Sequence, residues 1–421
     1  MKNTKFIDRL EAIGGRLQQN RYLIAISGGL ASLMPIIIVG ALSVVIDQFG
    51  LQAYQDFLVK IGLKQYLGAI NAVTNGMLGL YAAFSIAYNL ARQYKIDGFM
   101  SGIMSVASFL LVTPFGIMKD GKTAGIATNY LGHEGIFTGI ILGIIVVEIS
   151  RFMKEKGFTV KMPAGVPEMV DRSFTALTST AVVLIASLII KIIFASTPYE
   201  TFPGLITAIV QTPLSYLGGS WIALVIMMAV VNLLWWLGIH GHLVALSVLT
   251  PIYIQMDLEN LQAYQAGSEL PNIIGNSFIF VYASGAAVLF GLVFWLWKAK
   301  SERYNKLSKL AAIPMLFGIG EPLAYGIPYT LNPTLFIPVV FSASLNVILA
   351  YFGTLMGILP ILNGVAIQGG MPVVITGLLS GGWRVALFQI FLMFINVIVF
   401  YPFVKALDDV TYEQEQKAKE A

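Results

Sequence analysis

Cysteine is absent from this 421-residue chain, and charged residues are scarce. The absence of cysteine excludes disulfide bonds, thiolate metal ligands and a cysteine nucleophile within the chain. Only 11% of the residues are charged, whereas 57% are hydrophobic. These proportions exclude a soluble domain of ordinary composition, so the sequence predicts an integral membrane protein that crosses the bilayer many times.

Clusters of basic residues mixed with aromatic residues are also missing. The net charge of +4 comes from Lys and Arg near the ends of apolar segments, so we expect no nucleic-acid partner. The chain has three histidines, and no cluster of carboxylates accompanies them. We therefore expect no metal site, and no cofactor is indicated.

What the chain does contain is a series of uncharged runs long enough to span a bilayer. Residues 1–20 precede the first run, and their apolar positions recur at helical spacing among basic residues, which is typical of an amphipathic helix on a membrane surface. No cleavage site ends the first uncharged run, residues 23–46, so we do not expect a signal peptide. The uncharged runs are residues 23–46, 66–90, 98–118, 135–147, 173–190, 205–256 and 270–297, followed by 310–383, which only Glu321 interrupts.

At about 20 residues per crossing, these runs predict an all-α polytopic membrane protein with about ten transmembrane helices. Basic clusters near residues 2–21, 92–95, 151–172 and 298–309 are placed in the cytoplasm by the positive-inside rule, together with both termini. A single crossing through 221–253 would leave the last cluster on the wrong face. We therefore predict an additional half-crossing near His240.

Glu321 is the single charged residue between Lys309 and Arg384. A carboxylate in so apolar a stretch costs about 2.5 to 3.5 kcal/mol to insert in lipid, so we expect its side chain to face protein or water. Prolines and glycines interrupt the surrounding sequence, and such interruptions mark transport sites. We predict two re-entrant hairpins, near residues 310–332 and 363–383.

His240 and His242 follow a tryptophan-rich run that contains Trp235 and Trp236. Glycines near His240 would let a ligand approach it, so we interpret His240 as functional. For His242 we expect a hydrogen bond to a backbone carbonyl in a kinked helix.

Several short motifs occur in a fixed order along the chain. They are Gly165-Val166-Pro167 with Ser173-Phe174, Ile239-His240-Gly241, Leu270-Pro271-Asn272 with Asn276-Ser277-Phe278, Gly320-Glu321-Pro322 with Leu331-Asn332-Pro333, and Gly381-Gly382-Trp383-Arg384. Together they resemble the membrane-spanning IIC component of the bacterial sugar phosphotransferase system, in the branch for lactose, cellobiose and diacetylchitobiose. The resemblance covers nearly the whole chain.

The resemblance implies a homodimer in a bacterial cell membrane that binds a disaccharide and moves it inward by an elevator-like shift. In that family a IIB protein donates the phosphoryl group from a phosphocysteine, and a IIA protein charges IIB. Because this chain lacks cysteine, the donor is expected on a separate IIB polypeptide. The chain would then be the membrane subunit of a sugar phosphotransferase.

The family's conserved histidine and acid correspond to His240 and Glu321. Phosphoryl transfer to a sugar depends on positioning a hydroxyl and accepting its proton. The resemblance therefore implies Glu321 as hydroxyl acceptor and base, with His240 orienting the hydroxyl or stabilising charge. The alternative for Glu321 is a buried acid that only holds the tip of a hairpin.

Sugar binding also requires flat apolar faces and amides. Trp383, Trp236, Asn276, Asn332 and Asn363 are the candidates for these contacts. The alternatives are that the tryptophans anchor the membrane interface and that the asparagines cap or link helices.

The predicted organisation has five parts. We expect an N-terminal amphipathic helix (1–20), a dimerisation and scaffold domain of five helices (21–198), an interfacial linker helix (199–218), a sugar-binding transport domain (219–407) and a cytoplasmic tail (408–421).

Two other functions remain open from the residues alone. A proton-coupled sugar symporter would use Glu321 as its proton carrier, and it would accumulate unmodified sugar without a partner protein. A passive channel or sensor would keep its flux after Glu321→Gln.

Overall fold

The computed structural model describes residues 19–47, 52–117, 124–158, 160, 168–237, 241–283, 285–318, 323, 332–367 and 371–420. Within these residues the chain is largely helical and forms two compact units. The N-terminal unit comprises Gln18–Tyr216 with Ser247–Leu258. The C-terminal unit comprises Leu217–Leu246 with Glu259–Ala421. The predicted amphipathic helix at residues 1–20 lies almost entirely outside the described residues.

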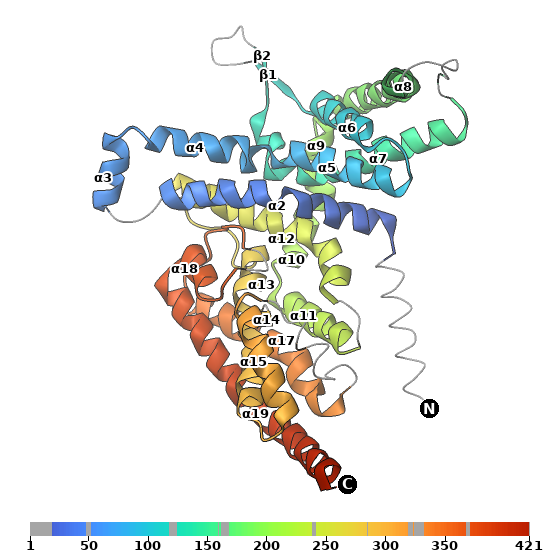
Figure 1. Cartoon of the computed structure of the whole chain (residues 1–421). Coiled ribbons are helices and arrows are strands. Elements are labelled where there is room, and N and C mark those ends of the chain that lie inside the picture. The colour runs from blue at the N-terminus through green and yellow to red at the C-terminus, as the bar shows by residue number, and fades with distance from the viewer. Residues whose placement is uncertain are drawn as a thin grey trace. The chain divides into compact units, whose positions relative to one another are not determined.

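In the described part of the chain, the N-terminal unit is built mainly from α2, α5, α6, α7 and α8, with several shorter helices beside them (Figure 1). Its helices are α2 (Arg21–Asp47), α3 (Gln52–Lys60), α4 (Lys64–Val73), α5 (Leu78–Gln93), α6 (Gly98–Val112), α7 (Ile136–Glu155), α8 (Glu168–Ala195), α9 (Phe202–Ile206) and α10 (Thr212–Gly218), with a π-helical turn, η4 (Thr207–Gln211), between the last two. Short 3₁₀ turns are η1 (Asn75–Met77), η2 (Thr128–Leu131) and η3 (His133–Gly135).

Helix α5 packs closely against both α2 and α7 because small residues line its contacts. A Cβ atom added at Gly139 of α7 would lie 2.6 Å from the carbonyl oxygen of Gly79 in α5, so the two backbones nearly touch. On the other side, the hydroxyl of Ser85 donates to the carbonyl oxygen of Gly29 in α2 at 2.6 Å. Close backbone approach and interhelical hydrogen bonds of this kind hold helices together in lipid, where apolar burial alone gives little preference.

The apolar run at residues 98–118 is only partly helical. Helix α6 ends at Val112, and Thr113 adopts an extended backbone with ψ of 138° before Pro114. A residue before proline disfavours the helical region, which accounts for the end of the helix. The following residues form β1 (Phe115–Ile117), which pairs antiparallel with β2 (Ala124–Ile126) so that Gly116 lies opposite Gly125. The all-α prediction did not include this small sheet.

The C-terminal unit contains the segments for which the sugar site was predicted. Its elements are α11 (Trp221–Trp236), the two ends of α12 (Gly241–Ala266), α13 (Asn276–Tyr282), α14 (Gly285–Trp297), α15 (Glu302–Leu316), η5 (Pro333–Leu335), α17 (Phe336–Leu355), α18 (Ile375–Gly381) and α19 (Trp383–Glu420). Helices α14 and α15 form an antiparallel pair, since Gly285 lies near Gly318 and a four-residue turn joins the other ends.

Two buried asparagines link the helices of this unit. Asn396 of α19 donates from Nδ2 to Asn346 Oδ1 in α17 at 2.9 Å, and Asn346 donates to the carbonyl oxygen of Tyr282 in α13 at 3.0 Å. Both asparagine side chains are fully buried. These bonds connect three helices that are far apart in the sequence, and they supply cohesion that apolar contacts cannot supply inside lipid.

Helix α19 continues through the predicted cytoplasmic tail and contacts the start of α15. The carboxylate of Asp408 accepts hydrogen bonds from the backbone amides of Lys300 at 2.8 Å and Ser301 at 3.0 Å. Glu415 accepts from the hydroxyl of Ser301 at 2.6 Å. The pKa of Lys300 is raised because Asp409 accepts a hydrogen bond from its ammonium group. The residues from 408 onward therefore fix the turn that precedes α15.

The prediction of a polytopic helical membrane protein is confirmed. Among the described residues, seven helices are long and apolar enough to cross a membrane, or eight if the pair Phe202–Gly218 and Trp221–Trp236 is one broken span. Helix α6 is apolar but only 15 residues long. The predicted number of ten transmembrane helices therefore stays a prediction.

Candidate functional site

The two predicted catalytic residues, His240 and Glu321, lie outside the described residues, and so does the predicted half-crossing near His240. The structure describes Leu237 and Gly241 near His240, and Gly318, Leu323 and Asn332 near Glu321. Helix α11 ends at Trp236, and α12 begins at Gly241. A Cβ atom at Gly241 would collide with the carbonyl oxygen of Val231, so only glycine allows α12 to begin this close to α11. His242 lies in α12, but its side chain is not among those described.

Trp236 is bonded to the segment that follows Glu321. Its indole Nε1 donates to the carbonyl oxygen of Asn332 at 2.9 Å, and its ring meets the ring of Phe336 edge to face at 5.0 Å. Asn332 Oδ1 in turn accepts a hydrogen bond of 3.0 Å from the backbone amide of Thr334. This bond caps η5, the turn that precedes α17. The structure thus brings together two of the predicted sugar-binding residues. The bond of Trp236 holds the backbone at Asn332, and the side chain of Asn332 holds the backbone at Thr334.

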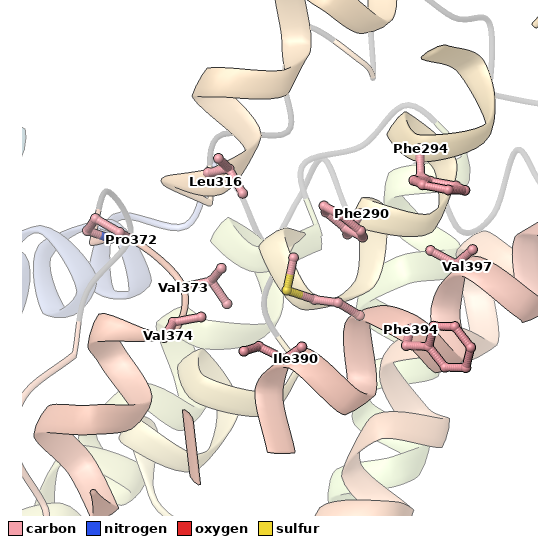
Figure 2. Close-up of a pocket in the computed structure, with 10 residues that line it drawn as sticks. Phe290, Phe294, Leu316, Pro372, Val373, Val374, Ile390, Phe394 and Val397 are labelled. Atoms are coloured by element: carbon pink, nitrogen blue, oxygen red, sulfur yellow. The ribbon is translucent and has the colours of Figure 1, made fainter. Parts of the chain in front are cut away.

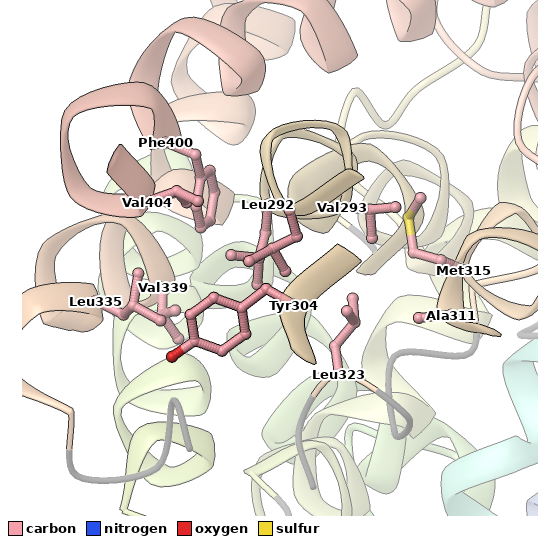
Figure 3. Packing of buried hydrophobic residues seen from close by; sticks show 11 residues of the cluster. Leu292, Val293, Tyr304, Ala311, Met315, Leu323, Leu335, Val339, Phe400 and Val404 are labelled. Carbon is pink, nitrogen blue, oxygen red and sulfur yellow. The ribbon is translucent and has the colours of Figure 1, made fainter. Parts of the chain in front are cut away.

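Leu323 is the one described residue between positions 319 and 331. It is fully buried in a cluster with Leu292, Tyr304 and Met315 (Figure 3). Trp236 packs against the same cluster. The remaining buried members are Val293, Leu296, Ala311, Leu335, Val339, Phe400 and Val404. Leu323, two positions after Glu321, and Trp236, four positions before His240, therefore pack on one apolar cluster.

Asn363, at the start of the second predicted hairpin, holds the chain against the end of α18. Its backbone amide donates to the carbonyl oxygen of Ser380, and its Nδ2 donates to that of Leu379, both at 2.9 Å. Its Oδ1 accepts from the amide of Val365 at 3.1 Å. The side chain is buried, with 8% exposed. Asn363 therefore shapes this turn through both ends of its amide.

The two predicted hairpins meet through a backbone hydrogen bond. The amide of Val373 donates to the carbonyl oxygen of Leu316, the last residue of α15, at 3.0 Å. The adjacent Val374 has φ of +73°, which is a strained conformation for a β-branched residue. This bond connects the chain just before Glu321 with the chain just after the glycines at 369 and 370.

Gln389 of α19 stabilises this strained turn, and the sequence analysis missed it. Its Oε1 accepts the amides of Val374 and Gly377, each at 3.0 Å, and its Nε2 donates to the carbonyl oxygen of Val281 at 2.8 Å. Nε2 also bonds the hydroxyl of Thr376 at 2.9 Å, and the side chain is fully buried. A lone glutamine in the apolar run of α19 was the available signal.

Asn260 is a second missed residue, and it joins three segments. Its Nδ2 donates to the carbonyl oxygens of Asn272 at 2.7 Å and Leu362 at 2.9 Å, while its Oδ1 accepts the amide of Asn272 at 2.9 Å. Asn272 donates from its own Nδ2 to Glu259 at 2.7 Å. This network positions the loop that leads to Asn276, whose side chain is 4% exposed at the first turn of α13.

Trp383 differs from the other candidates because its side chain is 64% exposed. It begins α19, and the guanidinium group of Arg384 lies 5.7 Å from the centre of its ring. The indole therefore faces outward from the C-terminal unit, whereas Asn276 and Asn363 are buried.

A cavity of about 430 Å³ lies beside the joined loops (Figure 2). Its lining is entirely apolar and consists of Phe290, Phe294, Leu316, Pro372, Val373, Val374, Ile390, Met393, Phe394 and Val397. A sugar site requires polar groups that fix the hydroxyls, so this cavity is unsuited to a sugar. Among the described residues, no group of three or more His, Asp or Glu side chains could hold a metal ion.

Comparisons with known proteins agree in pointing to one family. The family described as "Phosphotransferase system, EIIC" matches residues 27–343. The chain is 33% identical to the "Lichenan permease IIC component" of Bacillus subtilis (strain 168), covering 97% of this chain and 94% of that protein. It is 32% identical to the "PTS system cellobiose-specific EIIC component" of Geobacillus stearothermophilus, covering 97% and 95%. The crystal structure of the transporter ChbC, the IIC component from the N,N'-diacetylchitobiose-specific phosphotransferase system, matches with a TM-score of 0.91 and 30% identity over 96% of this chain and 98% of that chain.

Proposed function

Because this chain belongs to the EIIC family of the phosphotransferase system, we propose that it is the membrane permease that imports a β-linked disaccharide for phosphorylation. Three of the relatives it matches are named for lichenan, cellobiose and N,N'-diacetylchitobiose, all of which have β-linked units. Partners in this proposal are the disaccharide, a separate IIB protein that donates phosphate, and a IIA protein that charges IIB.

In this proposal Glu321 and His240 act on the reacting hydroxyl of the sugar. The hydroxyl oxygen attacks the phosphorus of the phosphocysteine on IIB, the phosphorus–sulfur bond breaks, and the thiolate leaves. Glu321 accepts the hydroxyl proton as the oxygen–phosphorus bond forms. His240 orients the hydroxyl in line with the leaving sulfur, because positioning contributes most of the catalysis in phosphoryl transfer.

The observation that carries the proposal is the shared anchor of the two catalytic segments. Leu323 follows Glu321 by two positions, Trp236 precedes His240 by four, and both residues pack on the same apolar cluster. Trp236 also bonds the carbonyl oxygen of Asn332. These contacts support a site in which the two loops face one substrate.

The hydrogen bonds of the other candidate residues separate those that shape the loops from those that contact the sugar. Asn332 and Asn363 use their side-chain oxygens to hold backbone amides, so they shape the loops around the sugar. Asn276, at the start of α13, reads a sugar hydroxyl. Trp236 and Trp383 supply apolar faces on which a sugar ring stacks.

We also propose that the C-terminal unit moves as a body in an elevator-type transport step, while the N-terminal unit forms the contact of a homodimer. Each unit is compact, which supports movement of one as a whole. Helix α8 of the N-terminal unit presents a row of exposed apolar side chains that includes Leu177, Ile185 and Ile192. Such a face suits contact with lipid or with a second copy.

The experiment that tests the function uses purified protein in proteoliposomes with phosphorylated IIB and a panel of β-linked disaccharides. We expect a sugar 6-phosphate that forms only when IIB is present. Glu321→Gln should abolish the product while sugar binding is partly retained. Glu269→Gln, which changes an exposed acid of the same unit, should leave the product unchanged.

Two results would contradict the proposal. Accumulation of unmodified sugar without IIB would indicate a proton-coupled symporter that uses Glu321 as its carrier. Unchanged flux through the Glu321→Gln variant would indicate a passive channel.

A further inference from the structure

A second cavity, of about 590 Å³, lies wholly within the N-terminal unit between α5, α6, α7 and α8. Three basic side chains line it, Arg92, Lys95 and Lys154, together with a single acid, Asp97. Its volume falls in the range of about 300 to 1,000 Å³ that is typical of small-molecule sites. The excess of positive charge in its lining favours an anionic ligand.

The side chains of Arg92 and Lys154 make specific contacts at the cavity. Arg92 lies with its guanidinium 5.7 Å from the centre of the Tyr88 ring. Lys95 sits in the turn between α5 and α6 with φ of +55°, and its carbonyl oxygen accepts a hydrogen bond from Lys154 Nζ at 3.2 Å. This bond connects the turn to α7. Three basic residues from two parts of the chain line this one cavity.

The single acidic residue of the lining already accepts a hydrogen bond from a backbone amide. Asp97 caps α6 by accepting the amide of Met100 at 3.0 Å. Its carboxylate therefore lies at the end of α6, and two net positive charges remain in the lining.

The rest of the lining suits a lipid. Ile96, Met100, Met104 and Ala176 provide an apolar wall. The hydroxyls of Ser101 and Ser150 already donate to the carbonyl oxygens of Asp97 and Val146, at 2.7 and 2.8 Å. A ligand with an anionic head and an apolar body would match both parts of this lining.

The position of the cavity along the helices points to the same ligand. Arg92 and Lys154 lie at the ends of two candidate membrane spans, Tyr66–Gln93 and His133–Glu155. Phospholipid headgroups meet the protein at this level, and basic pockets between helices on the cytoplasmic side bind anionic headgroups. A soluble protein partner would need a broad surface rather than a recess between helices.

We propose that this cavity binds an anionic phospholipid of the inner leaflet, with its phosphate between Arg92, Lys95 and Lys154 and its acyl chain along the apolar wall. The bound lipid would bridge α7 and the turn between α5 and α6, and so stabilise the N-terminal unit. This site is separate from the sugar site and does not depend on the proposed transport reaction.

The test is native mass spectrometry of the full-length detergent-solubilised protein, titrated with phosphatidylglycerol or with phosphatidylcholine of identical acyl chains. We expect phosphatidylglycerol to bind at least tenfold more tightly. Arg92→Gln and Lys154→Gln should each weaken phosphatidylglycerol binding about fivefold, and Arg92→Lys should restore most of it. Lys156→Gln is the matched control, since Lys156 is an exposed lysine at the end of α7 outside the cavity lining.

Several results would overturn the proposal. Equal binding of phosphatidylglycerol and phosphatidylcholine by the unaltered protein would overturn it. This comparison does not require any variant to fold. An equal loss on Lys156→Gln would show a general charge effect. Competition by free glycerol 1-phosphate at millimolar concentration would indicate a small-anion site instead, and displacement of the lipid by phosphorylated IIB would assign the cavity to that protein.

Discussion

The indole Nε1 of Trp236 donates a hydrogen bond of 2.9 Å to the carbonyl oxygen of Asn332, a residue 96 positions later in the chain. This bond joins the end of α11 to the start of α17. Both residues were selected from the sequence as sugar contacts, yet this bond gives each a role in fixing the loops around the site. The distinction between contacting a sugar and positioning a loop can be measured.

Trp236→Phe should lower both stability and sugar phosphorylation. The substitution keeps the aromatic contact with Phe336 but removes the indole donor, and the loss of a hydrogen bond to a partly buried carbonyl costs about 1 kcal/mol. Thermal unfolding in detergent and the rate of sugar-phosphate formation are the measurements. Trp221→Phe, at the other end of α11 where the ring stacks on Tyr351, is the control. Equal effects of the two substitutions would contradict the positioning role.

Gln389→Leu should destabilise the C-terminal unit by about 3 kcal/mol or more. The substitution removes four hydrogen bonds from a buried side chain, and two of these hold the turn that contains Val374 with its positive φ. Thermal unfolding measures the loss. Gln262→Leu changes an exposed glutamine of α12 and should have an effect within about 0.5 kcal/mol. A small effect of Gln389→Leu would show that the turn is held by other contacts.

Lys191→Met should weaken the contact between α6 and α8. The ammonium group of Lys191 donates to the carbonyl oxygen of Leu111 at 2.9 Å, close to the end of α6, where a positive charge is favourable. Methionine has a similar length but no donor, so we expect a loss of about 1 to 3 kcal/mol in the free energy of unfolding. Lys191→Arg should recover much of this loss. If Met and Arg variants unfold at the same temperature as the unaltered protein, the bond does not contribute.

Deletion of residues 408–421 should destabilise the turn between α14 and α15. Asp408 and Glu415 accept hydrogen bonds from Lys300 and Ser301, and those donors would lose their partners. Hydrogen exchange at residues 298–304 should increase in the truncated protein. Deletion of 417–421 alone keeps Asp408 and Glu415 and removes the exposed ion pair between Lys419 and Glu302, and such pairs contribute little. An equal increase in both truncated proteins would contradict the capping role.

The helical membrane fold could be predicted from the sequence because hydrophobic length is a local property. The run at 23–46 became α2, and the run at 173–190 became the central part of α8. The run at 270–297 became α13 and α14, with a break near Ala283 that was not predicted. Each of these features depends on residues that are neighbours in the chain.

The polar contacts that shape the site could not be predicted in this way. Asn260 bonds the carbonyl oxygen of Leu362, and Gln389 bonds that of Val281, over separations of 102 and 108 positions. A side chain that bonds a distant backbone carbonyl leaves no pattern in its own segment. Asn332 and Asn363 were recognised as important, but the alternative of capping and linking describes the bonds they make.

The backbone hydrogen bond from Val373 to Leu316 couples the end of α15 to the turn before α18. While that bond lasts, a displacement of Val373 is passed on to the end of α15. In the elevator-type step proposed above, this coupling would let the two segments travel together as parts of one rigid body.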